Sequence, residues 1–157
     1  MDQALKSLIL EIVAKHRVLT LATLRPDGWP QATTVGYAAE GMTIYFLCGA
    51  DSQKAANLTH CNKVSLTIDD DADEMFALKG LSMAATAEFI DDPARTARIF
   101  RALVGKYPQA KDMPEPAPGT VRYVRLTPKV ISVLDYSKGF GHTDLVTVAA
   151  NDLAAAA

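Results

Sequence analysis

The sequence predicts an α+β protein dominated by β-structure, in which a curled antiparallel sheet or small barrel carries short peripheral helices. The 157-residue length suits one domain with a sizeable core, expected to span 1–157 with an N-terminal helix within 1–16 and a tail over 137–157. Apolar residues make up 49% of the chain and charged residues 22%, which is ordinary for a globular protein. The first three predicted strands are joined by turns too short for parallel crossovers, so we expect them to pair antiparallel.

A helix is predicted over residues 2–15, because apolar residues recur there at helical spacing. Its apolar positions are Leu5, Leu8, Ile9, Ile12 and Val13. A β-hairpin follows, with strands at Arg17–Leu24 and Trp29–Ala38 joined by the turn Arg25–Gly28, "RPDG". A second turn is predicted at Glu40–Gly41.

The third predicted strand, Met42–Cys48, leads into a short helix over residues 51–59 with Asp51 or Ser52 as its N-cap. Lys54 then falls in the first turn, where the helix macrodipole is positive and a cation costs about 0.3–1 kcal/mol. Two interpretations are open. Lys54, Ser52 and the free N–H groups bind an anion such as a phosphate, or Lys54 is a surface lysine screened by Asp51.

The second half of the chain continues the β-pattern around one further helix. The predicted elements are a strand at Asn62–Ile68, an acidic loop at Asp69–Glu74, a strand at Leu78–Ile90, a helix capped by Asp92, an irregular connection at Pro108–Gly119, and extended segments over Thr120–Tyr136 that are bent or broken at Pro128. The apolar stripe of that helix is Ala97, Phe100, Leu103, Val104 and Tyr107. The acidic loop lacks the glycine and distal glutamate of a calcium loop, so a solvated loop is favoured over a metal site. The alanine-rich end is expected to fray.

Charge and composition exclude several classes of function. The net charge is −2 and no basic run reaches five residues, so general nucleic-acid binding is not expected. The N-terminal region is too short and too charged for a membrane span and lacks the order of a signal peptide, so we expect a cytoplasmic protein. The two cysteines, Cys48 and Cys61, have no metal-ligand spacing. Reduced, packed thiols are favoured, with a disulfide as the alternative.

The order of these elements resembles that of the pyridoxamine 5′-phosphate oxidase-like FMN-binding split-barrel superfamily. The resemblance rests on the hairpin "VLTLATLRPDGWPQATTVGYA", the strand "MTIYFLC" and the segments "SQKAANL" and "NKVSLTI", and it covers roughly Val18 to Glu88. It implies a six-stranded antiparallel split β-barrel that forms a homodimer, with FMN bound in clefts at the dimer interface.

Carried over residue by residue, the resemblance implies a cofactor site. The family's S-R-K phosphate segment falls on Ser52, Gln53 and Lys54, where Gln53 replaces an arginine. The other implied cofactor contacts are Thr33, Thr34 and Val35 in the second strand, Leu47 and Cys48 at the end of the third, and Lys79 beside Gly80. The family's strand motif R-M-V-L-L-K begins and ends on cations, but Ala32 and Tyr37 stand at those two positions in this chain.

The glycine-bearing tail "DYSKGFGHTDL" is the other unusual segment. Phe140 lies between two glycines, with Tyr136, Lys138 and His142 close in sequence. Either this is a surface turn that covers the barrel, or Phe140 lies near a flavin ring while His142, with Tyr136 as a second candidate, exchanges a proton near neutral pH. Trp29 is expected to pack in the protein or in a dimer rather than to stack on a flavin.

The resemblance favours an FMN-dependent oxidoreductase that transfers hydride to or from a small planar or nicotinamide-type substrate. Oxidation of vitamin B6 itself is not expected, because the tryptophan- and arginine-bearing C-terminal segment of true pyridoxamine phosphate oxidases is missing. Three alternatives stay open: a deazaflavin coenzyme in place of FMN, haem bound through His142, and a non-catalytic flavin carrier or sensor.

Overall fold

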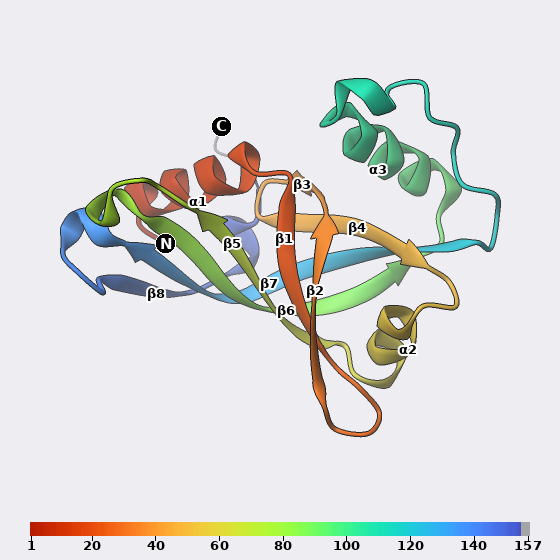
Figure 1. The fold of residues 1–157 in the computed structure, drawn as a ribbon, viewed down its shortest axis with the longest axis horizontal. Helices are drawn as coiled ribbons and strands as arrows, with labels where there is room; N and C mark the ends of the chain where they lie inside the picture. Colours follow the sequence, from red (N-terminus) through yellow and green to blue (C-terminus); the bar gives the residue numbers. More distant parts are fainter. Residues whose placement is uncertain (155–157) are drawn as a thin grey trace.

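Eight strands form one antiparallel sheet that curls into a half-open barrel in the computed structural model, which describes residues 1–154 (Figure 1). The strands are β1 Val18–Leu24, β2 Pro30–Gly36, β3 Ala38–Glu40, β4 Thr43–Gly49, β5 Lys63–Asp70, β6 Lys79–Ile90, β7 Val121–Asp135 and β8 Thr143–Thr147. Their order in the sheet is β2-β1-β5-β6-β7-β4-β3, and β8 also pairs with β7. The alanine-rich end, expected to fray, lies outside the described residues beyond position 154.

Within the described part of the chain, three α-helices and four short 3₁₀ turns lie around the sheet (Figure 1). They are α1 Gln3–Lys15, α2 Gln53–His60, α3 Pro93–Gly105, η1 Met75–Ala77, η2 Pro108–Ala110, η3 Tyr136–Lys138 and η4 Ala150–Asp152. Side chains of Asp2, Ser52 and Asp92 cap the three α-helices. No helix within residues 1–154 is long and apolar enough to cross a lipid bilayer.

The predicted α+β class, mainly β with an antiparallel sheet and peripheral helices, is confirmed. The strand count is eight rather than six for two reasons. The predicted strand Trp29–Ala38 divides at Tyr37, which is fully buried and donates a hydrogen bond from its hydroxyl to the Val13 carbonyl at 2.7 Å. The glycine-bearing tail also returns to the sheet, because β8 pairs with the second half of β7.

The segments predicted to be bent or broken at Pro128 form one long strand, β7, which carries an irregularity at Pro128 but no break. Ala84 of β6 pairs with Val130 and Ala85 pairs with Pro128, so Lys129 is the extra residue of a β-bulge. Proline has no N–H to give to a ladder, and a bulge is a place where a sheet tolerates it. The strand therefore continues through Pro128 and joins both ends of the molecule.

The core fills the inside of the curled sheet, and α1 closes it with its apolar side. The predicted positions Ile9, Ile12 and Val13 are buried there, while Leu5 and Leu8 are partly buried. A second, smaller cluster joins α3 to the outer face of the sheet; its buried members are Ala38, Tyr45, Ile99 and Leu103. The sheet thus separates an inner core from an outer layer under α3, and the residues at the end of β4 contact one or the other.

Candidate functional site

The start of α2 is built by the residues that directly follow β4. The Ser52 hydroxyl accepts a hydrogen bond from the Ala55 N–H at 3.2 Å and donates one to the Gly49 carbonyl at 2.7 Å. This cap leaves the backbone N–H groups of Gln53 and Lys54 with no acceptor among the described residues. The first turn of α2 therefore presents two open donors and a lysine at one end of the barrel.

Lys54 lies against the end of the barrel rather than in open solvent. Its side chain is half-buried, and Nζ is 5.9 Å from the centroid of the fully buried Phe46 ring. Burial lowers the pKa of the Lys54 ammonium, and the neighbouring Cys48 acts in the opposite direction. No carboxylate within residues 1–154 forms an ion pair with it. A cation in this position is available to an anionic ligand.

Arg122 is a second cation at this site, and the sequence analysis missed it. It pairs with Cys48 across the β4–β7 ladder, and its guanidinium lies 3.9 Å from the centroid of the Phe89 ring. Burial raises the pKa of the Cys48 thiol, whereas the Ser52 hydroxyl and the charges of Lys54 and Arg122 lower it. Only the pairing of β4 with β7 brings Arg122 to this place, so no local pattern in the sequence could have found it.

Gln53 takes part in a polar network that holds α2 on the β1–β2 hairpin. Its Nε2 donates to Asn57 Oδ1 at 2.8 Å. Asn57 Nδ2 then donates to Thr23 Oγ1 at 2.9 Å and to Gln31 Oε1 at 3.0 Å. Asn57 is 0% exposed and Thr23 is 4% exposed, so this network orients the start of α2 from within the protein.

The three predicted contacts in β2 lie on an edge strand, which within residues 1–154 pairs only with β1. Val35 faces the core, Thr34 is exposed and Thr33 is half-buried. The Thr33 hydroxyl oxygen is buried and has no hydrogen-bond partner among the described residues. An unpaired strand edge with an unsatisfied hydroxyl suits a polar ligand that supplies donors and acceptors.

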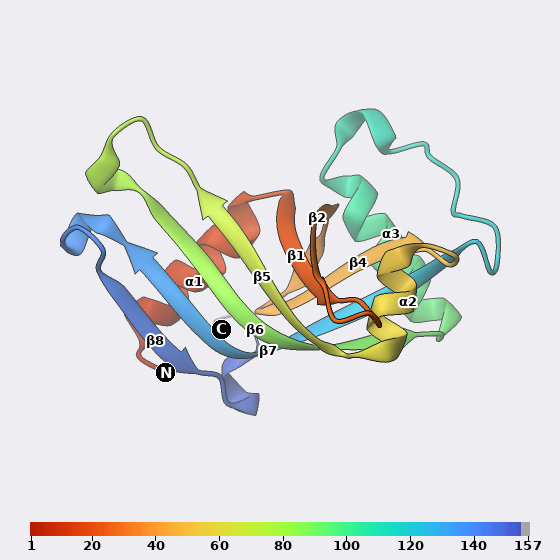
Figure 2. The ribbon, with the colours of Figure 1, turned by 60° about the horizontal axis from the view of Figure 1, so that its bottom comes forward.

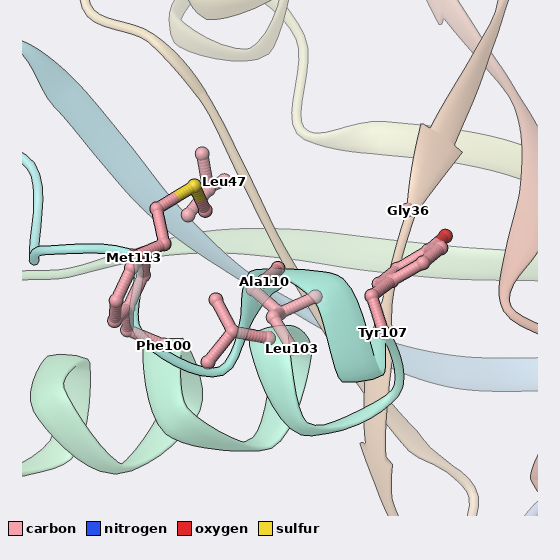
Figure 3. A pocket seen from close by; sticks show the side chains of 8 residues that line it. Gly36, Leu47, Phe100, Leu103, Tyr107, Ala110 and Met113 are labelled. Carbon is pink, nitrogen blue, oxygen red and sulfur yellow. The ribbon is translucent and has the colours of Figure 1, made fainter.

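Leu47, on the other side of β4 from Cys48, lines an apolar cavity of about 220 Å³ under α3 (Figure 3). The lining residues are Gly36, Leu47, Phe100, Leu103, Val104, Tyr107, Ala110 and Met113. Figure 3 shows the Tyr107 ring reaching towards Gly36. A Cβ placed on Gly36 would lie 3.7 Å from the Tyr107 hydroxyl, so a larger side chain there would fill the cavity. The end of β4 thus separates this cavity from the two cations.

The remaining predicted residues lie at the far end of the β6–β7 ribbon from Lys54. Lys79 pairs with Asp135 in the ladder, and the rings of Tyr136 and Phe140 are 5.2 Å apart. Phe140 is 72% exposed. Figure 2 shows β8 at one end of this ribbon and α2 at the other. The 12 residues of β6 correspond to a length of roughly 36 Å. Within one protomer, these residues therefore do not reach the start of α2 at Lys54.

Trp29 is exposed, whereas His142 is half-buried. His142 Nε2 is 3.1 Å from Asp144 Oδ2, and the same carboxylate accepts a hydrogen bond from Lys138 Nζ at 2.9 Å. Trp29 is 72% exposed at the tip of the β1–β2 hairpin, so it does not pack within the protomer. Both cysteines are free thiols, Cys48 buried and Cys61 half-buried.

Asp135, at the Lys79 end, gives the protein a predictable acid sensitivity. Burial raises its pKa, but hydrogen bonds from Ser137 and the charges of Lys79 and Lys138 outweigh this and hold the pKa below its ordinary value of 3.8. The ionised form therefore stabilises the fold above about pH 4, and this contribution is lost as the pH falls through the lowered pKa. We expect Asp135→Asn to destabilise the protein at pH 7 and to differ progressively less from wild type as the pH falls below 3.8 and through the lowered pKa. Denaturant titrations of wild type and Asp135→Asn at several pH values measure the difference in the free energy of unfolding. Asp91→Asn is the control for losing an exposed carboxylate. A difference that stays constant with pH would contradict the prediction.

Comparison with known proteins gives one family match and many similar structures. The family model for pyridoxamine 5′-phosphate oxidase matches residues 5–135. A conserved hypothetical protein from Mycobacterium tuberculosis is 29% identical with a TM-score of 0.76, over 95% of this chain and 92% of the other. No curated protein matches the chain.

Two further structures share the fold at lower identity. A Clostridium acetobutylicum protein related to general stress protein 26 of Bacillus subtilis, of the pyridoxinephosphate oxidase family, is 15% identical with a TM-score of 0.70, over 94% of this chain and 97% of the other. A haem-binding protein from Mycobacterium smegmatis is 23% identical with a TM-score of 0.75. That match covers 94% of this chain but 59% of the Mycobacterium smegmatis protein.

Proposed function

The chain belongs to the pyridoxamine 5′-phosphate oxidase family, and from this premise we propose that it binds FMN at the α2 end of the barrel and acts as an FMN-dependent oxidoreductase. The observation that carries the proposal is Lys54, a half-buried lysine in the first turn of α2 that has no carboxylate partner within residues 1–154. A phosphate at this helix start would offset both the dipole penalty and the burial of the ammonium.

The residues at this end fit a flavin mononucleotide in chemical terms. Lys54 and the open N–H groups of the first turn would hold the phosphate, with Ser52 shaping the turn. The edge of β2, with the unsatisfied hydroxyl of Thr33, offers polar groups to the ring system. Tyr37, which stands where the family motif has a lysine, is buried inside the protein and takes no part in this site.

When bound, a flavin supplies hydride transfer to or from a substrate carbon, and the chain supplies binding, orientation and exclusion of water. Hydride transfer requires no protein base, which agrees with the lack of a catalytic triad in the sequence. A small planar substrate or a nicotinamide-type donor suits such a site.

A homodimer is part of this proposal. Lys79, Tyr136, Phe140 and His142 contribute to the same site as Lys54 only if a second copy places its β6–β7 end there, because the two ends of one protomer lie far apart. Sedimentation should then give twice the 16.9 kDa mass of one chain. A monomer in the presence of saturating FMN would remove those four residues from the site.

Titration of the purified protein with FMN, the deazaflavin coenzyme and haem tests the proposal directly. We expect flavin absorbance that stays with the protein through gel filtration, and reduction of the bound FMN by a nicotinamide donor. Preferential binding of the deazaflavin, or a Soret band without flavin binding, would overturn the FMN assignment. Bound FMN that no donor reduces would instead identify a flavin carrier or sensor and overturn the oxidoreductase assignment.

A further inference from the structure

We propose that Arg122 is the second cation of the anion site at the start of α2, and that Arg122 and Lys54 together bind the doubly charged phosphate monoester of the ligand. This inference deepens the proposed function and rests on it for the identity of the ligand. Nothing in the family motif marks Arg122, because it comes from the first residues of β7, far along the chain from the S-R-K segment.

The strand pairing brings Arg122 beside Cys48, and Lys54 also lies close enough to act on the same thiol. Cys48 is the pairing partner of Arg122 in the β4–β7 ladder, and the charges of both Lys54 and Arg122 act on the Cys48 sulfur. Each cation also lies over an aromatic ring, Lys54 over Phe46 and Arg122 over Phe89. These contacts hold both side chains at the barrel end without neutralising either charge.

The two arginines on the first half of β7 differ in whether a carboxylate neutralises their charge. Arg125 lies three residues after Arg122 on β7, so its side chain is on the other face of the sheet. There it forms an ion pair with Glu88 of β6. Arg122 has no carboxylate partner within residues 1–154. Two half-buried, unneutralised cations beside the open N–H groups of a helix start are best satisfied by an anion that carries two negative charges.

Lys54 and Arg122 together also explain how this chain can bind a phosphate although it lacks arginines at the two positions where the family motifs have them. Gln53, in place of one arginine, is engaged with Asn57, and Ala32 has no charge to offer. Arg122 supplies a guanidinium from a neighbouring strand instead, and a guanidinium matches the geometry of phosphate oxygens well.

The test is Arg122→Gln, with Arg125→Gln as the matched control on the same strand and Arg122→Lys as the charge-preserving variant. FMN and riboflavin, which lacks the phosphate, are the two probes. We expect Arg122→Gln to weaken FMN binding about 10- to 100-fold and to leave riboflavin binding unchanged. Arg122→Lys should retain part of the FMN affinity, and Arg125→Gln all of it. Unchanged FMN affinity in Arg122→Gln would overturn the proposal, as would an equal loss for both flavins.

Thermal unfolding in the presence of inorganic phosphate distinguishes a failure of the Arg122 assignment from a failure of the FMN assignment. Phosphate should raise the midpoint of thermal unfolding of the wild-type protein and of Arg125→Gln, and should raise that of Arg122→Gln clearly less. If the protein binds no flavin at all but phosphate acts in this way, the anion site stands and the FMN assignment fails. If phosphate stabilises wild type and Arg122→Gln alike, the Arg122 assignment is wrong whatever flavin binds.

Discussion

Lys54→Ala is expected to weaken FMN binding by roughly 1–3 kcal/mol, as for the loss of one charge-assisted hydrogen bond. The free energy of unfolding should change little or rise slightly, because the substitution removes a cation from the positive end of α2. The contact of Lys54 Nζ with the Phe46 ring, at 5.9 Å from the centroid, offsets that gain in part, so the net change should stay small. Fluorescence titration with FMN and denaturant unfolding without it measure the two quantities separately.

The control for Lys54→Ala is Lys63→Ala, which removes an exposed lysine from the start of β5. We expect it to leave FMN affinity unchanged, and we expect riboflavin affinity to be unchanged in both variants. Equal FMN affinity in wild type and Lys54→Ala would show that the lysine is only a surface charge, and the proposed function would then rest on family membership alone.

Asn57→Ala is expected to destabilise the protein by about 2–4 kcal/mol. The fully buried Asn57 amide bonds to groups on three other residues, and one of these, the Thr23 hydroxyl, is itself buried. Removing the amide leaves that hydroxyl without its donor and loosens α2 from the β1–β2 hairpin. Denaturant unfolding in the absence of ligand measures the effect.

Thr59→Ala is the matched control on the same helix. The Thr59 hydroxyl donates to the Ala55 carbonyl at 2.9 Å from an exposed position, so its loss should cost about 0.5 kcal/mol or less. A similar loss of stability in Asn57→Ala and Thr59→Ala would mean that the polar network contributes no more than a surface hydrogen bond. The start of α2 would then owe its orientation to something other than the Asn57 amide.

The residues of the candidate site divide by how far their placement depends on distant parts of the chain. Ser52 caps α2, and Lys54 lies in its first turn, as the short stretch after the third strand predicted. Lys79 and Phe140 were predicted for the same site, yet the length of β6 separates them from Lys54 within one protomer. Arg122 had no local signature at all, and the β4–β7 register alone places it beside Cys48.

The sequence by itself determined local elements: the helix caps at Ser52 and Asp92, and the hairpin turn that ends at Gly28, whose φ is 87°. Caps and turns depend on hydrogen bonds between residues a few positions apart, so composition and spacing suffice to predict them. Only the tertiary structure decided the number of strands, the bulge at Lys129 and the neighbours of Lys54. These depend on which distant segments bury their apolar faces together, and a shift of one residue in strand register would turn Arg122 to the opposite face of the sheet.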